Sequence, residues 1–131
     1  MDNLIFDRTE LDIQNKNKKS RYNYIDFNRI ESWCEYISTT LNSFSYTVNI
    51  ITKTGYNRKN RPNESDLERI RVNINRLKEA YFSFTQIPEN LEYMTIQKAN
   101  AIEKILYEIN TLLNNMISQF YYCGEIYVGE V

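Results

Sequence analysis

Three stretches of this chain carry apolar residues at alternating spacings of three and four, the repeat that lines one face of an α-helix. The first stripe consists of Phe27, Ile30, Cys34, Ile37, Leu41 and Phe44. The second consists of Leu67, Ile70, Ile74, Leu77, Tyr81 and Phe84. The third consists of Ala99, Ile102, Leu106, Ile109, Leu113, Met116 and Phe120. Such helices bury their stripes by packing together, so we predict a mainly α fold, a three-helix bundle with heptad-spaced helices.

The spacing of the stripes and a polar residue before the third one indicate where two of the helices begin. We expect the first helix to span residues 26–42 and the third to begin after Thr95, a residue type that caps helices. Ile105 and Leu112 widen the third stripe, and a wider apolar face contacts more than one neighbour. The third helix is therefore predicted to be central and to touch both others.

The second helix has two candidate caps. Ser65 and Glu68 have the spacing of a capping box, and so do Asn63 and Asp66 two residues earlier. The helix should end before Pro88, because the residue that precedes a proline is pushed out of the α region.

A weak internal repeat links the first two helices. Residues 26–30, Asp-Phe-Asn-Arg-Ile, align with residues 66–70, Asp-Leu-Glu-Arg-Ile. Either a duplication or a period shared by two amphipathic helices explains it.

Two segments outside the stripes favour extended structure. The connection 46–54 begins with Tyr-Thr-Val-Asn-Ile-Ile-Thr, and β-branched and aromatic residues of this kind predict a short strand. In the C-terminal tail, Ile126 and Val128 alternate with Tyr127, which predicts a strand or a hairpin edge.

The N-terminal segment differs from the rest in composition. Residues 4–6 are apolar, whereas residues 14–20 include three lysines and no apolar residue. We therefore predict a docking arm and linker over residues 1–23 and a helical domain with a C-terminal strand over residues 24–131. The arm is expected to dock on a partner, with packing against the bundle as the alternative.

The residue types present argue against catalysis. The chain has no histidine, the commonest general base and metal ligand, and its three glycines cannot build a phosphate-binding loop. Acidic residues, Glu31, Glu35 and Glu103 among them, are expected on solvated helix faces away from the stripes. We predict no catalytic, cofactor-binding or metal-binding residues and no enzymatic activity.

The charge balance argues against two classes of partner. The formal net charge is −1, from 16 basic and 17 acidic residues, which gives no general drive toward nucleic acid or an anionic membrane. No segment approaches the ~20 apolar residues of a membrane span, and no signal-peptide pattern opens the chain. We expect a soluble protein made in the cytoplasm. Cys34 is expected as a buried thiol in the first stripe, with a Cys34–Cys123 disulfide as the alternative.

Tyrosine is unusually common, with 11 residues, several of them outside the stripes. Tyrosine suits protein interfaces because it buries a large area and keeps a polar tip, although capping of the bundle core is an equal alternative. The candidate assembly contacts are Ile5, Phe6, Asp7, Arg8, Thr9, Tyr22, Tyr24, Tyr121, Tyr122, Ile126, Tyr127 and Val128.

Several short segments, in order along the chain, resemble a module of tail-fibre and baseplate-associated proteins of Firmicutes phages and prophages. The first is Asp7-Arg8-Thr9 with Asp12-Ile13, similar to a D-R-T-x-x-D-V start. The next two are Asp26-Phe27-Asn28-Arg29-Ile30-Glu31 and Leu67-Glu68-Arg69-Ile70-Arg71. The last two are Lys98-Ala99-Asn100-Ala101-Ile102-Glu103-Lys104 and Tyr122-Cys123-Gly124-Glu125.

The resemblance implies a virion structural protein of the tail tip, baseplate or fibre, without enzymatic activity. It implies assembly with itself, for which a trimer would be natural, and with other tail or baseplate proteins. The chain departs from the pattern at Ile25, where a Thr or Ser cap is expected, and ends soon after Tyr-Cys-Gly-Glu, which favours a connector over a receptor-binding protein. Nothing in the sequence supports a host-surface glycan as ligand.

Two other functions follow from the residues. One is a cytoplasmic regulatory helical module, inhibitor-like or antitoxin-like, that binds a cellular protein. The other is nucleic-acid binding, which would weaken steeply with salt, through Lys16, Lys18, Lys19, Arg21, Arg58, Lys59 and Arg61.

Overall fold

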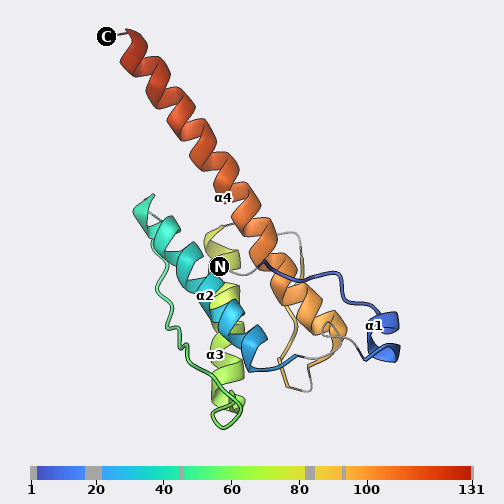
Figure 1. Cartoon of the computed structure of the whole chain (residues 1–131). Helices are drawn as coiled ribbons and strands as arrows, with labels where there is room; N and C mark the ends of the chain where they lie inside the picture. Colours follow the sequence, from blue (N-terminus) through green and yellow to red (C-terminus); the bar gives the residue numbers. More distant parts are fainter. Residues whose placement is uncertain (1–2, 17–21, 45, 82–84, 93, 131) are drawn as a thin grey trace.

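The computed structural model describes residues 3–16, 22–44, 46–81, 85–92 and 94–130, with side chains in α4 up to residue 119. The helices are α1 (Glu10–Gln14), α2 (Tyr24–Ser43), α3 (Glu64–Ala80) and α4 (Ile96–Glu130). The predicted helical bundle is confirmed, because α2, α3 and α4 pack against one another (Figure 1). The third predicted helix touches both others as expected, but each of the three does so, and none is central.

The three bundle helices run in the same direction, and the connections between them run back along the bundle (Figure 1). Near their N-terminal ends, Arg29 of α2 pairs with Glu103 of α4 at 2.8 Å. Near the opposite end, the Tyr81 hydroxyl just after α3 donates to the carbonyl oxygen of Leu112 in α4 at 3.2 Å. Residues near the starts of the helices thus contact one another, and so do residues near their ends.

Capping boxes set where two of these helices begin. Asn23 and Asp26 form one at the start of α2, so this helix begins two residues earlier than predicted and needs no Thr or Ser before Asp26. Asn63 and Asp66 form the second, which selects this frame over Ser65 at the start of α3. In α4, the predicted cap is confirmed, since the Lys98 amide donates to the Thr95 hydroxyl at 3.2 Å.

Helix α3 ends sooner than its apolar stripe. Tyr81 already has an extended backbone (φ −144°, ψ 137°), and its ring packs against Tyr46 with 5.6 Å between ring centroids. The prediction that Tyr81 continues the helix was wrong, because its side chain is held by Tyr46 and α4 instead. Phe84 lies outside the described residues.

The predicted strand at 46–54 is not present in the described part of the connection. This segment is extended, but side chains of α2 and α3 take its backbone hydrogen bonds in place of a neighbouring strand. Asn42, for example, accepts from the Val48 amide at 2.9 Å and donates to the Val48 carbonyl at 3.0 Å. The helix side chains that bond the backbone of this segment, or of the two residues after it, are Asn28, Glu31, Asn42, Arg69, Asn73 and Arg76.

The predicted C-terminal strand was also wrong, because α4 continues to Glu130. The spacing of the third stripe itself continues from Phe120 to Cys123 and Tyr127, three and four residues further on. That helical period outweighs the three-residue alternation around Tyr127, even though each internal glycine costs a helix about 1 kcal/mol.

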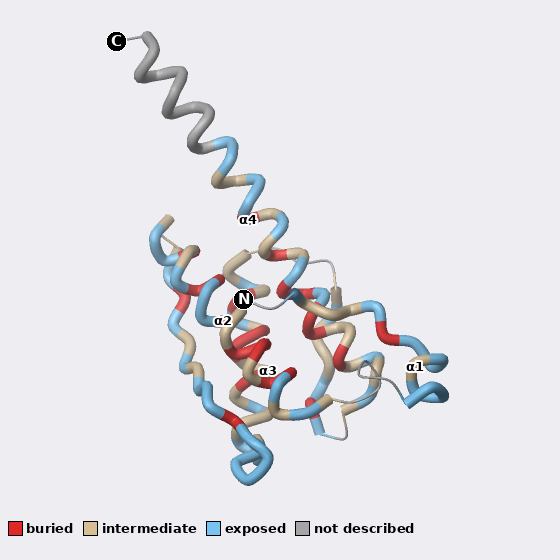
Figure 2. Tube along the Cα trace, viewed as in Figure 1, coloured by how far each residue is buried: buried red, intermediate tan, exposed pale blue. Residues whose placement is uncertain are grey.

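The core is built from the stripes (Figure 2). Fully buried residues from all three helices include Ile30, Ile37, Leu41, Ile70, Ile74, Leu77, Ile102, Leu106, Ile109 and Leu113. The connections add Val48, Tyr56 and Leu91. Cys34 is a buried free thiol, as expected, and burial raises its pKa above the usual range. The side chain of Cys123 lies outside the described residues.

Replacement of Ile102 by aspartate tests the assignment of the core. Ile102 is fully buried, so Ile102→Asp places an unpaired charge among apolar side chains and should cost about 4 kcal/mol or more of unfolding free energy. The control is Lys104→Asp, two residues away on the exposed face of α4. Urea denaturation followed by circular dichroism measures both, and equal stability of the two variants would contradict the assignment.

Candidate functional site

The N-terminal arm lies along the first turns of α4. The Asn100 side chain accepts from the Arg8 amide at 3.0 Å and donates to the Arg8 carbonyl oxygen at 2.9 Å. The amide of Ile5 donates to Glu103 at 3.0 Å, and the ring of Phe6 lies 4.6 Å from that of Tyr107. The arm is therefore fixed to the bundle at several points.

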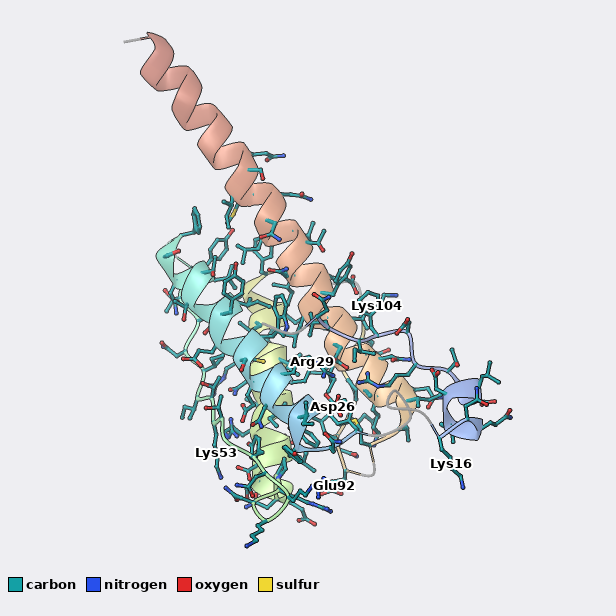
Figure 3. The ribbon with its side chains drawn as sticks, in the orientation of Figure 1. Lys16, Asp26, Arg29, Lys53, Glu92 and Lys104 are labelled. Carbon is teal, nitrogen blue, oxygen red and sulfur yellow. The ribbon has the colours of Figure 1, made fainter. Side chains whose placement is uncertain are left out.

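A buried charge cluster joins the arm to the starts of α2 and α4. It consists of Arg8, Asp26, Arg29 and Glu103. Figure 3 labels two of its members, Asp26 and Arg29, near the start of α2. Glu103 is 0% exposed. It accepts hydrogen bonds from Arg8 Nη1 at 2.5 Å and from Arg29 Nε at 2.8 Å. Asp26 accepts a hydrogen bond from Arg29 Nη2 at 2.7 Å, and its Oδ1 atom lies 3.5 Å from Arg8 Nη2. Two positive and two negative groups balance, so the cluster is neutral as a whole.

Pairing is what allows these charges to be buried. A buried ion that loses its partner is strongly destabilising. The pKa of Arg29 is raised even though burial acts to lower it, because hydrogen bonds and charges from Glu103 and Asp26 outweigh the burial. The Arg8 guanidinium also lies 5.0 Å above the centre of the Tyr22 ring.

A second cluster joins α2, α3 and the connection between them. Glu31, 1% exposed, accepts from Arg69 of α3 at 2.8 Å and from the Tyr56 hydroxyl at 2.8 Å. Arg69 also donates to the carbonyl oxygen of Ile51 at 2.7 Å. Burial, together with the bond to Glu31, raises the pKa of Tyr56. The cluster fixes the returning connection to the bundle.

The expectation that the acidic side chains face solvent was wrong for two of them. Glu31 and Glu103 lie one position beyond the stripe residues Ile30 and Ile102, and both are buried. Arginines from other segments make this burial tolerable, and no local sequence pattern shows which arginine reaches which helix. Glu35 is exposed, as expected.

The structure brings together only some of the predicted assembly residues. Arg8 is buried, and Ile5, Phe6, Tyr22 and Tyr24 are half-buried against their own bundle. Asp7 and Thr9 are exposed, and Thr9 caps α1 in a box with Asp12. The remaining candidates belong to the part of α4 whose side chains lie outside the described residues: Tyr121, Tyr122, Ile126, Tyr127 and Val128.

Several exposed apolar side chains were missed because they fall outside the stripes. Leu11 and Ile13 of α1 are exposed, and so are Ile25, Tyr36 and Ile51. Single exposed apolar residues are common. Leu11 and Ile13, however, lie close together on the short α1, the part of the arm that follows its anchored residues (Figure 2).

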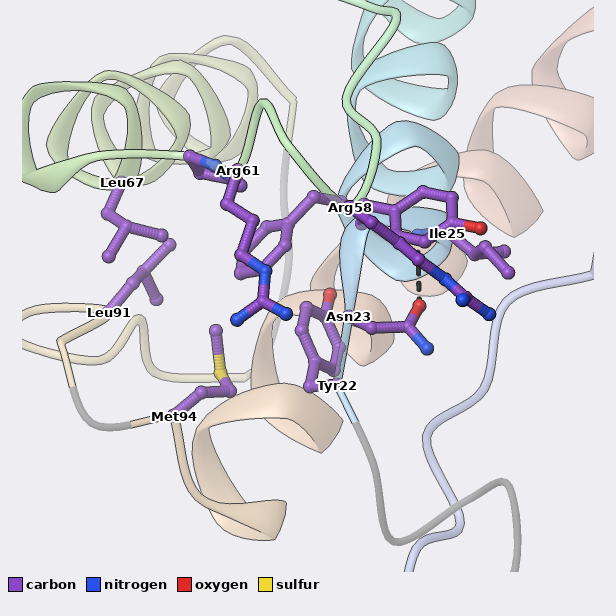
Figure 4. Close-up of a pocket in the computed structure, with 11 residues that line it drawn as sticks. Tyr22, Asn23, Ile25, Arg58, Arg61, Leu67, Leu91 and Met94 are labelled. Atoms are coloured by element: carbon purple, nitrogen blue, oxygen red, sulfur yellow. Dashed lines mark hydrogen bonds between the residues drawn. The ribbon is translucent and has the colours of Figure 1, made fainter.

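A pocket of about 650 Å³ lies at the end of the bundle where α2 and α3 begin and the chain enters α4 (Figure 4). Its lining is largely apolar and aromatic, with two arginines from the basic loop. A turn centred on Asn57, whose side chain accepts from the Lys59 and Asn60 amides at 2.9 and 2.8 Å, shapes that loop. The lining residues are Tyr22, Asn23, Tyr24, Ile25, Phe27, Arg58, Arg61, Pro62, Leu67, Leu91 and Met94.

The basic residues considered for nucleic-acid binding do not form one described surface. Arg58 and Arg61 line the pocket, whereas Lys16 and Lys59 are exposed elsewhere on the arm and the loop. Lys18, Lys19 and Arg21 lie outside the described residues.

Over the described residues, no group of three or more Cys, Asp or Glu side chains is placed to hold a metal ion. The same residues include no helix that is both long and apolar enough to cross a membrane. Comparisons with protein-family models, with curated proteins and with solved structures found no match.

Removal of Arg8 tests the first cluster. Arg8→Met leaves one excess negative charge beneath the arm and should cost about 3 kcal/mol of unfolding free energy. The double variant Arg8→Met/Glu103→Met keeps the Asp26–Arg29 pair and restores neutrality, so it should be more stable than Arg8→Met alone. Urea denaturation measures both, with Lys16→Met on the exposed part of the arm as control. A double variant less stable than Arg8→Met would show that charge balance is not the dominant effect.

Two glutamates one turn apart on α2 test the second cluster. Glu31→Gln removes the charge that Arg69 and Tyr56 contact, and should cost about 2 kcal/mol of unfolding free energy. Glu35→Gln changes an exposed side chain and should cost less than about 0.5 kcal/mol. Thermal denaturation compares the two, and similar melting temperatures would contradict the role given to Glu31.

Proposed function

We propose that this chain is a structural protein of a phage or prophage tail, located in the baseplate, tail tip or fibre connection and acting through protein–protein assembly. The support begins with the segments that resemble tail-fibre and baseplate-associated proteins. Each of those segments alone is a short and common pattern. The segments also lie far apart in the sequence.

The observation that carries the proposal is that residues from separate segments contact one another. Arg8 comes from the first segment, and Asp26 and Arg29 come from the second. Asn100 and Glu103 come from the segment at the start of α4. Contacts among these segments are what one structural module containing all of them would require. This supports the proposal that the resembling segments belong to one module.

This contact set also bears on where assembly takes place. Arg8, Asp26, Arg29 and Glu103 are buried, so they stabilise the chain and are not offered to a partner. Assembly then rests on residues outside the buried contact set, such as Leu11 and Ile13 of α1, the pocket and the extended part of α4.

Purified particles test the proposal directly. Tails isolated from a strain that produces this chain should contain it in fixed proportion to other tail proteins, as measured by mass spectrometry and located by electron microscopy. In solution, the chain should form a homo-oligomer. A strict monomer that is absent from purified tails would contradict the proposal, and a stable complex with a cellular protein would favour the regulatory module instead.

A further inference from the structure

The pocket at the start of the helices has a net positive lining. Arg58 and Arg61 are exposed at its rim and make no hydrogen bond or ion pair with the rest of the described chain. No acidic residue lines the pocket within that same part. The first amides of α2 and α3 are already capped by their own boxes, so the two arginines supply the uncompensated charge.

Apolar side chains make up another part of the lining. Phe27, Leu67, Leu91 and Met94 line the pocket, and its volume of about 650 Å³ is in the range of pockets that enclose several side chains or a small molecule. Tyr22 also lines it, and the buried Tyr22 hydroxyl makes no hydrogen bond. The complementary occupant carries apolar or aromatic groups flanked by carboxylates.

The C-terminal part of α4 has this chemistry. Residues 105–131 include three glutamates and no lysine or arginine. Its last residues, 120–130, combine apolar and aromatic residues, among them Tyr122, Ile126 and Val128, with Glu125 and Glu130.

The pocket and this segment are at opposite ends of one molecule. The pocket lies where the parallel helices begin, whereas α4 extends past the ends of α2 and α3 in the other direction (Figure 1). One chain therefore cannot fill its own pocket, but a second copy can. Such contacts are head-to-tail, and they either close into a ring or continue as a filament.

We propose that the pocket binds the end of α4, residues 120–130, of a second copy, with Arg58 and Arg61 pairing with Glu125 and Glu130. This inference rests on the proposed function, because it specifies the contact through which the chain assembles with itself.

Charge reversal tests the pairing. The pocket variant is Arg58→Glu/Arg61→Glu, and the helix variant is Glu125→Lys/Glu130→Lys. Each should raise the dissociation constant of self-association at least about 100-fold, as measured by sedimentation equilibrium of the full chain. An equimolar mixture of the two variants places opposite charges in contact again, so association should recover to within about tenfold of the original. The control is Lys59→Glu, an exposed residue of the same loop that does not line the pocket, and it should change nothing.

Three results would overturn the inference: a monomeric original chain, unchanged association of either reversed variant, or no recovery in the mixture. Circular dichroism of each variant separates loss of binding from loss of folding. The presence of the chain in purified tails is a separate measurement. A chain found in tails whose reversed variants still self-associate refutes this contact alone and leaves the tail function intact.

Discussion

The burial of one carboxylate, that of Glu103, organises the end of the bundle where the helices begin. Glu103 is completely removed from solvent in the second turn of α4, where an unpaired charge would be strongly destabilising. Its two partners come from different elements, Arg29 from α2 and Arg8 from the arm. Satisfying this one group therefore fixes the position of the arm, the start of α2 and the relative height of α2 and α4.

The two clusters share a design that follows from the parallel arrangement. Arg29 follows its helix cap by six residues, and so does Arg69. Each pairs with the aspartate of its own capping box and with a glutamate of a neighbouring helix. Those glutamates, Glu31 and Glu103, both follow a cap by eight residues, at Asn23 and Thr95. Parallel helices in register bring such equivalent positions to the same height.

The sequence predicts the parts of the fold that depend on local spacing. The stripes identify the helices and most of the core, and the cap at Thr95 marks the start of α4. It does not predict helix direction, because a long connection fits either a parallel or an antiparallel return. The strand expected at 46–54 failed for a related reason, since a β-branched segment becomes a strand only where another strand pairs with it.

The candidate site was harder to predict, because it depends on which distant side chains meet. The arm was recognised from its composition, but its partners Asn100 and Glu103 were not. Glu31 and Glu103 were expected in solvent, since nothing near them in sequence signals the arginines that bury them. The pocket combines residues from three separate segments, and only the basic loop was noted in advance.

The shared direction of the helices also bears on how the chain acquires its structure. In an up-and-down bundle, each helix meets the next across a short turn, and the first contacts to form are local. Here α2 packs against α3 and α4 across long returning connections. Arg8 of the N-terminal arm contacts Glu103, which lies 95 residues later in the sequence. Contacts that close long loops form slowly, since the loop entropy is lost before the contact is gained. This bundle should therefore fold at rates nearer to those of mixed α/β domains than to those of other helical proteins of its size.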